Sequence, residues 1–411
     1  MKEECLVNTR GRHGGVRVLI ISACMAVLLG GAAAAQEELD WPKDGLEIDG
    51  QTLRFGGVLD YRSGVRHIRA KNGGGFTVGP KARINNYTGA AQWTREMYFH
   101  GDTNSVAEEV FEIDRAFVAD QSGFDPEGGK HDWEPFGFCQ LSMENATLKT
   151  HSTKSIPSML KRMGEELVPD AELNFMGTCT WIVDTEHQVY RGTCRSWRDL
   201  TIVTHKDLTV IPDGRIPNSR FGDRTITKKG KGVLHVAGRQ FYYLGPPHLK
   251  QEGRIPVLRV EEGTLRMRTN PFAHQAGEGN VRCVAPRIEV GPEGRMEFLA
   301  RSTVESIVCD GLTRMDKGGK VVSNCRLSDS SVLVLPPPRL SRMRASAAAL
   351  EVGGDLEMGG TLRVDAASMK PGRYPLFRVA GKTAGAFKAI EVPAGLTGAL
   401  ANDGQMVISA K

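Results

Sequence analysis

Short segments in which apolar and polar residues alternate recur along the whole chain, each bounded by Gly, Pro or Asp. Clear examples are residues 45–55, 232–236 and 360–364. Alternation with a period of two places every second side chain on the same face of an extended strand, so that one face of each segment can be buried. Many short strands separated by turn residues predict an all-β protein.

A longer pattern, apolar-x-Val-x-Pro-x-x-Arg-apolar, is found in four places. Each copy predicts a strand, a turn at the proline and a second strand, because proline lacks a backbone donor and cannot lie within a central strand. Recurrence of one such unit predicts repeats that stack on each other. We therefore expect the copies to occupy equivalent positions in stacked coils, at residues 76–84, 208–216, 288–296 and 332–340.

Residues 226–243 combine a Lys-rich strand pattern, a Gly-x-Gly turn, a second strand and a Gly followed by aromatic residues, and residues 258–267 add a Gly-Thr-Leu strand. Residues 359–364, 371–377 and 393–398 form a similar closing pattern. Together these segments resemble the bacterial exported proteins with autotransporter-associated β-strand repeats. The resemblance covers about residues 200–411 and implies a right-handed parallel β-helix that is displayed or secreted. Unlike a self-transporting protein, the sequence shows no set of long alternating strands for an outer-membrane barrel.

The expected fold is thus all-β: a single elongated right-handed parallel β-helix, or β-solenoid, over residues 36–411, with irregular loops and one or two short helices. Residues 359–411 are its closing module. Residues 98–173 break the pattern and are expected to form a loop-rich insertion.

Two elements are expected within the insertion. Residues 105–108 read Ser-x-x-Glu, a pattern of helix starts, whereas Phe111 and Ile113 alternate as in a strand, so that both structures are open there. Residues 157–167 have apolar side chains at helical spacing and predict a short helix.

The first 35 residues have the pattern of a secretory signal. Arginines precede an apolar run over residues 18–29, and Ala33 to Ala35 offer a cleavage site before Gln36. The alternatives are an uncleaved anchor or buried helix, and a lipid-modified Cys24. No second apolar run of spanning length follows, so we expect no membrane span after cleavage and an extracellular, cell-surface or periplasmic location.

The net charge and the cysteines limit the partners and the cross-links that we expect for this protein. The net charge is only +5 and is spread along the chain, which argues against nucleic acid as a partner. The six cysteines after the signal favour either one to three disulfides, paired within 139/179/194 and within 283/309/325, or buried thiols. The basic segment 228–231 is expected to be a solvated turn that protects a strand edge.

Candidate chemistry is sparse. The densest polar cluster comprises Asp125, His131, Asp132, Trp133 and Glu134, which fit either a solvated loop or a cation or sugar contact. Asp184 and Glu186 share one strand face beside His187, and a replacement of both acids by alanine is expected to leave fold and activity unchanged. His205 and His235 are likewise interpreted as ordinary strand or turn residues without a catalytic role. No nucleophile elbow, phosphate loop or dinucleotide fingerprint is present.

We therefore expect no catalytic residues and no cofactor, and leave a metal site open. The leading hypothesis is an exported non-enzymatic structural or adhesive β-repeat protein whose partners are polysaccharide or other cell-surface components. The alternative is a polysaccharide-processing enzyme, a lyase or glycosidase, on the same scaffold.

Overall fold

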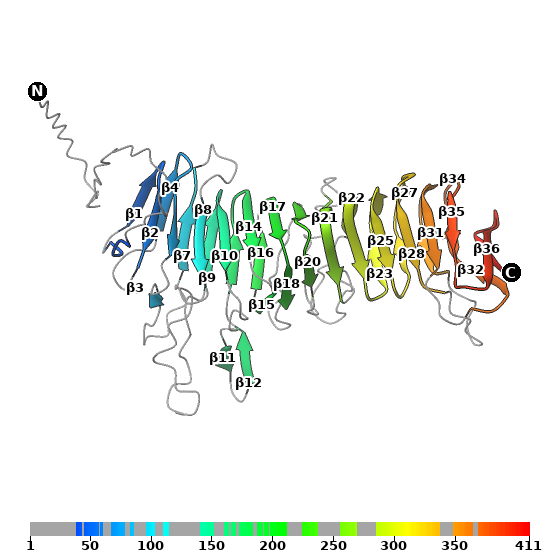
Figure 1. The fold of residues 1–411 in the computed structure, drawn as a ribbon, viewed down its shortest axis with the longest axis horizontal. Helices are drawn as coiled ribbons and strands as arrows, with labels where there is room; N and C mark the ends of the chain where they lie inside the picture. Colours follow the sequence, from blue (N-terminus) through cyan, green and yellow to red (C-terminus); the bar gives the residue numbers. More distant parts are fainter. Residues whose placement is uncertain are drawn as a thin grey trace, which may run out of the picture.

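A computed structural model describes the strands of the chain and the turns that join most of them (Figure 1). The described residues are all-β, and their strands are mostly parallel and lie in long sheets. The strands follow one another along a single long axis, with β1 and β36 near opposite ends. The described ranges are 38–42, 45–56, 58–60, 67–78, 83–85, 96–102, 110–114, 140–151, 160–163, 166–169, 172–183, 187–191, 193–196, 198–211, 224–236, 255–268, 285–337, 348–364 and 369–411.

Successive strands fall into three columns, and we call one passage of the chain through them a rung. The longest, column 2, is parallel throughout and comprises β2 (Thr52–Phe55), β5 (Gly75–Val78), β8 (Val110–Asp114), β10 (Thr147–His151), β14 (Cys179–Val183), β17 (Leu200–Thr204), β19 (Thr225–Lys229), the first halves of β21 (Val257–Met267) and β22 (Arg287–Phe298), β24 (Ser306–Cys309), β27 (Cys325–Leu327), β30 (Leu356–Met358) and β34 (Thr383–Gly385).

Column 1 contains the strands that precede those of column 2 along the chain. It comprises β1 (Leu46–Asp49), β4 (His67–Lys71), β7 (Glu96–His100), β9 (Gln140–Glu144), β13 (Glu172–Phe175) and β16 (Thr193–Ser196). A second parallel sheet takes the same place along the chain in later rungs, with β23 (Ser302–Val304), β26 (Gly319–Val321), β29 (Leu350–Val352) and β33 (Phe377–Val379).

Column 3 contains the strands that follow those of column 2. It comprises β15 (His187–Arg191), β18 (Asp207–Ile211), β20 (Val233–Val236), the second halves of β21 and β22, β25 (Leu312–Met315), β28 (Val332–Leu335), β31 (Thr361–Val364) and β35 (Ala389–Glu391). Nearer the N-terminus β3 (Val58–Asp60) pairs with β6 (Arg83–Asn85). Because β21 and β22 run through the corner without a break, they join columns 2 and 3.

Only two small parts of the described chain are antiparallel. One is the hairpin of β11 (Leu160–Met163) and β12 (Glu166–Pro169). The other is a sheet at the C-terminal end, in which β37 (Gln405–Ala410) lies between β32 (Gly372–Pro375) and β36 (Leu396–Leu400).

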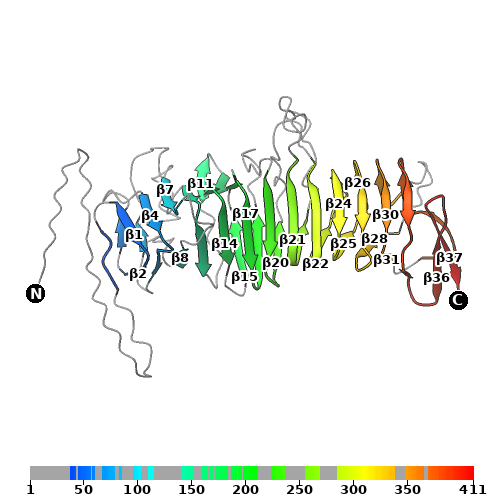
Figure 2. The ribbon, with the colours of Figure 1, turned by 90° about the horizontal axis from the view of Figure 1, so that it is seen from above.

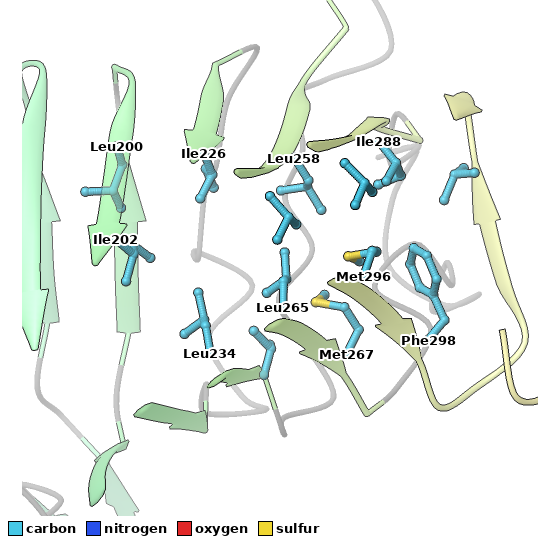
Figure 3. Packing of buried hydrophobic residues seen from close by; sticks show 14 of the residues in the cluster. Leu200, Ile202, Ile226, Leu234, Leu258, Leu265, Met267, Ile288, Met296 and Phe298 are labelled. Atoms are coloured by element: carbon cyan, nitrogen blue, oxygen red, sulfur yellow. The ribbon is translucent and has the colours of Figure 1, made fainter. Parts of the chain in front are cut away.

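The core lies between the columns and is built from residues that stack on their equivalents in the next rung. Figure 3 shows two such rows, one from column 2 and one from column 3. In column 2 the inward side chains are Leu200, Ile226, Leu258, Ile288, Ile307, Cys325 and Leu356, each paired in register with the next and all buried. In column 3 Leu208, Leu234, Leu265 and Met296 do the same. Apolar burial at about 25 cal/mol per Å² makes these rows the main stabilising term.

Polar side chains secure the turn before column 2. Asn324 Oδ1 accepts a hydrogen bond from the backbone N–H of Asp355 at 2.9 Å, and Asp355 Oδ1 accepts one from Lys382 at 2.7 Å. The residue before each donor is a glycine, and a Cβ on Gly354 would lie 2.3 Å from Asn324 Oδ1. Glycine is therefore required by close approach at this turn.

The structure corrects the expected helix and the expected equivalence of the proline motifs, and it confirms one of two open alternatives. The described residues of 157–167 do not form a helix, because β11 and the first half of β12 lie there as a hairpin, and no described residue is helical. Near residues 105–108, which lie outside the described residues, Phe111 belongs to β8, so the strand hypothesis is confirmed there. The four proline motifs are not equivalent. Those at 76–84 and 288–296 begin in column 2, whereas those at 208–216 and 332–340 begin in column 3. Of the described prolines, Pro336 directly follows β28, and Pro292 lies within β22 at the register shift between its two halves, where it has no partner on β21. Pro80 and Pro212 lie outside the described residues.

Lys228 corrects the expectation of a solvated turn at 228–231. Its side chain is fully buried, and its ammonium group donates hydrogen bonds to three backbone oxygens, those of Lys229, Gly230 and Glu262, at 2.7, 2.5 and 3.1 Å. Glu262 also accepts from the Gly230 N–H at 3.1 Å. Burial lowers the pKa of Lys228 to about 8, and the Glu262 carboxylate opposes this shift. Lys228 thus holds together the corner between β19 and β21.

We predict that Lys228→Met lowers the free energy of unfolding by about 1–3 kcal/mol at pH 7, because buried carbonyls lose their charged donor. Lys229→Met is the matched control, since Lys229 is half-exposed in an ion pair with Glu261 at 3.0 Å, and it should change stability by less than about 0.5 kcal/mol. Urea denaturation of the mature protein measures both.

The same variant carries a pH signature. The folded pKa of Lys228, about 8, lies below its ordinary 10.5, so the unfolded chain binds more protons between these values. Wild-type stability should therefore rise with pH over that window, and the rise should be missing in Lys228→Met. Parallel pH profiles of the two proteins would contradict this assignment of the lysine.

Candidate functional site

The structure does not describe most of the candidate site residues that the sequence singled out. Asp125, His131, Asp132, Trp133 and Glu134 lie outside the described residues, as do Asp184 and Glu186. His187 is the first residue of β15, although its side chain is not among those described. The predictions about these residues therefore stay predictions.

The other two histidines lie on different columns. His205 is exposed in the turn after β17 and borders a shallow groove of about 440 Å³ on the outer face of column 2, with Thr52, Thr77, Val110, Lys149 and Ile182. His235 lies on the outer face of column 3, in register with Thr209 and Arg266. Burial, followed by the charges of Arg266 and Arg268, lowers the pKa of His235. The structure does not bring these histidines together.

Three cysteines are buried thiols. Cys179, Cys309 and Cys325 are free, so the disulfide hypothesis is wrong for them and the thiol alternative is confirmed. Burial raises the pKa of Cys179 and of Cys309 to about 11, and that of Cys325 to about 12. Thr313 donates a hydrogen bond to Cys309 Sγ at 3.3 Å. The side chains of Cys139, Cys194 and Cys283 lie outside the described part.

The described residues hold one chain of linked titratable groups, which we call the histidine ladder: His67, His100 and Glu144. They come from β4, β7 and β9, three neighbouring strands of column 1. His67 Nδ1 lies 3.0 Å from His100 Nε2, and His100 Nδ1 lies 2.9 Å from Glu144 Oε2. The inward residues between them, such as Phe99, are fully buried, which fixes the ladder on the outer face.

Ring geometry shows that the two imidazoles meet edge to edge. Their planes are 22° apart and their centres are 5.3 Å apart, so the facing nitrogens lie between the ring centres, as in a hydrogen bond within the ring plane. Tyr98 lies directly beside His67 in register, with ring centres 4.7 Å apart and planes 12° apart. The outer face of column 1 therefore carries three nearly parallel rings.

Hydrogen-bond chemistry orders the ladder. A carboxylate can only accept, so His100 Nδ1 donates to Glu144. In a neutral His100 the other nitrogen, Nε2, is then an acceptor, and His67 Nδ1 donates to it. Each group thus orients the next, in the manner in which a carboxylate orients a catalytic imidazole. Such a chain can accept and pass on a proton.

Charged residues continue the same row. Register places Glu47 beside Arg69, Arg69 beside His100, and His100 beside Glu144, so that two basic residues lie between two acidic ones along column 1. In the neighbouring row Lys71 forms an ion pair with Asp49 at 3.0 Å. The pKa of Asp49 is lowered, first by a hydrogen bond from Asn72 and then by one from Lys71. The row is extended, and the described residues contain no group of three or more His, Cys, Asp or Glu side chains placed to hold a metal.

Sequence reasoning missed the ladder because its members are far apart in the chain, His67 and His100 by 33 residues and His100 and Glu144 by 44. Spacing within the sequence gives no signal for residues that meet only through rung stacking. The one available clue was that each member is a polar residue at one end of its column 1 strand. Only the register of the strands shows that these residues meet.

Comparisons with known proteins add no family. No family model matches the chain, and no curated protein matches it. Among the described residues no helix has the length and apolar character needed to cross a membrane.

We predict that Cys179, Cys309 and Cys325 resist alkylation by iodoacetamide at pH 8 in the native protein and react once the chain is denatured, because the thiolate is the nucleophile and burial disfavours it. Mass spectrometry of each cysteine peptide measures the labelling. Rapid native labelling at any of the three sites would contradict their place in the core.

We also predict that His100→Ala lowers the free energy of unfolding by about 1–2 kcal/mol, since it removes both hydrogen bonds of the ladder. His205→Ala is the matched control on an exposed turn and should change it by less than about 0.5 kcal/mol. Equal effects in urea denaturation would show that the ladder does not tie the strands together.

Proposed function

We propose that the chain is an exported right-handed parallel β-solenoid that serves as a non-enzymatic structural or adhesive protein of the cell surface. The observation that carries the proposal is the in-register stacking of column 2 from β2 to β34. Stacked repeats of this kind present long outer faces, which suit extended partners. Export rests on the expected signal over residues 1–35, which lies outside the described residues.

The outer faces support this proposal by their chemistry. Ion pairs join adjacent rungs at outer positions, as in Arg259 with Glu289 at 2.7 Å, Arg266 with Glu297 at 2.6 Å, and Arg363 with Glu391 at 2.6 Å. Each pair is partly exposed, so it contributes only about 0–1 kcal/mol to stability. Such rows keep the surface polar and offer hydrogen-bonding groups to polysaccharide or other cell-surface components, which we propose as partners.

A second candidate function, polysaccharide cleavage by a lyase or glycosidase, is favoured by the histidine ladder. Proton abstraction from a sugar needs a positioned base, and His67 is oriented through His100 by Glu144, with Tyr98 beside it. In that case Glu144 and His100 are positioning residues and His67 or Tyr98 touches the substrate.

One experiment separates the two. Mature wild-type protein is tested against immobilised acidic and neutral polysaccharides, with bound protein and released reducing or unsaturated ends both measured. We predict retention on at least one polysaccharide, no product, and the same retention for His100→Gln. Product that forms with the wild type and falls by more than about 100-fold in His100→Gln, with an unchanged thermal midpoint, would establish the enzyme instead.

Failure to bind any polysaccharide, together with a lack of product, would remove the adhesive function. N-terminal sequencing of protein exported by a bacterial host tests the signal. Material that keeps Met1, or that starts at a lipid-modified Cys24, would contradict cleavage before Gln36.

A further inference from the structure

The C-terminal end of columns 2 and 3 has an open edge. β34 pairs with β30 and β35 pairs with β31, and no strand of the described residues 369–411 pairs with the opposite edge of either. β37 does not pair with them, because β32 and β36 already occupy both of its edges. An open parallel edge presents unpaired N–H and C=O groups to any strand that can align with it.

The opposite end of column 2 is closed in a different way. Leu39 forms a bridge to Phe55 at the edge of β2, and the Trp41 ring stacks on Phe55 with centres 4.1 Å apart. The N-terminal end of the core is thus covered by apolar residues from the same chain.

At the C-terminal end the last rung is only partly covered, although Met406 and Ile408 of β37 belong to the same buried core. Leu356 and Leu362 are 1% and 0% exposed, whereas Thr383, stacked on Leu356, is exposed, and Ile390, stacked on Leu362, is only partly buried. A groove of about 880 Å³ lies between this last rung and the turn from β36 to β37. Figure 2 shows β36 and β37 beyond the last rung.

The groove has the features of a strand-binding surface. Its walls carry the apolar residues Val379, Phe387, Ile390 and Leu400. In strand addition main-chain hydrogen bonds supply affinity and apolar recesses receive alternate side chains. A partly covered end of a hydrophobic core, next to strand edges that no described strand pairs with, provides both.

Charge defines the occupant further. Arg378 and Lys382 are exposed beside the groove, and no described acidic side chain forms an ion pair with either. Lys388 and Glu391 are already paired, with Asp329 at 2.9 Å and Arg363 at 2.6 Å. The last rung therefore has an excess of positive charge that complements an acidic segment.

We propose that this end of the columns binds an extended segment of another polypeptide, which adds as a strand to β34 and β35. Its alternate apolar side chains cover Phe387 and Ile390, and acidic residues at its ends lie beside Arg378 and Lys382. This interaction is independent of whether the outer faces bind polysaccharide.

The test uses the mature chain and a synthetic peptide of roughly ten residues, about the length of a long strand, with alternating Val and Thr and Glu at both ends. Fluorescence anisotropy measures binding, and hydrogen exchange measures amide protection. We expect binding to the wild type with slowed exchange at 383–385 and 389–391. Thr383→Glu, which places a charge over the core end, should weaken binding by about ten-fold or more.

Ala384→Glu is the matched control, because it adds the same charge to the adjacent exposed residue on the outer face of β34. It should bind as the wild type does. If Thr383→Glu lowers the thermal midpoint, the double variant Arg378→Glu/Lys382→Glu decides instead, and it should prefer a peptide with Lys at both ends. No binding, equal loss in Thr383→Glu and Ala384→Glu, or equal binding of the Glu-ended and Lys-ended peptides to the wild type would overturn the proposal. Sedimentation gives one further test. If the wild type forms a dimer and Thr383→Glu abolishes it, the occupant is a second copy of the chain and the proposal is wrong.

Discussion

In-register stacking of inward side chains is the constraint on which the rest of this structure depends. A parallel strand offers no tight turn to its neighbour, so each rung must pass through several strands before it meets the previous one again. Burial then requires an apolar residue at every second position and the same phase in the next rung, as in the row from Leu200 to Leu356. A slip by one residue would turn every inward side chain outward. Lys228 and the Asn324–Asp355 turn act at the corners, where main-chain groups leave the ladders and need other partners.

The same register that fixes the core also decides what the surface can do. Outer residues of successive rungs lie side by side, and opposite charges therefore meet in ion pairs between neighbouring strands. The histidine ladder is a case of this rule, because His67, His100 and Glu144 meet only through the alignment of β4, β7 and β9. β34 and β35 end their columns for the same reason, because no strand of the described residues aligns with their far edges.

The sequence could predict the strands but not their neighbours. Alternation at 45–55, 232–236 and 360–364 correctly gave β structure, because the period of two depends on the residues alone. Residues 157–167 misled, since apolar residues at helical spacing also suit a short hairpin, and tertiary context decided between them. The burial of Lys228 was not predicted, because the three backbone oxygens that accept its hydrogen bonds come from two rungs. The histidine ladder could not be predicted, because rungs differ in length and no spacing in the chain encodes which residues align.

Distances between spin labels along column 2 test the stacking most directly. The outer row runs Thr201, Thr227, Arg259, Glu289, Val308, Arg326, Glu357 and Ala384, each paired in register with the next. With adjacent strands about 4.8 Å apart, labels at Thr201 and Val308 should be about 19 Å apart, and labels at Thr201 and Ala384 about 34 Å apart. Pulsed electron paramagnetic resonance on the mature protein should give two narrow distributions near these values. Equal distances for the two pairs, or a shorter distance for Thr201 and Ala384, would contradict the stacked columns.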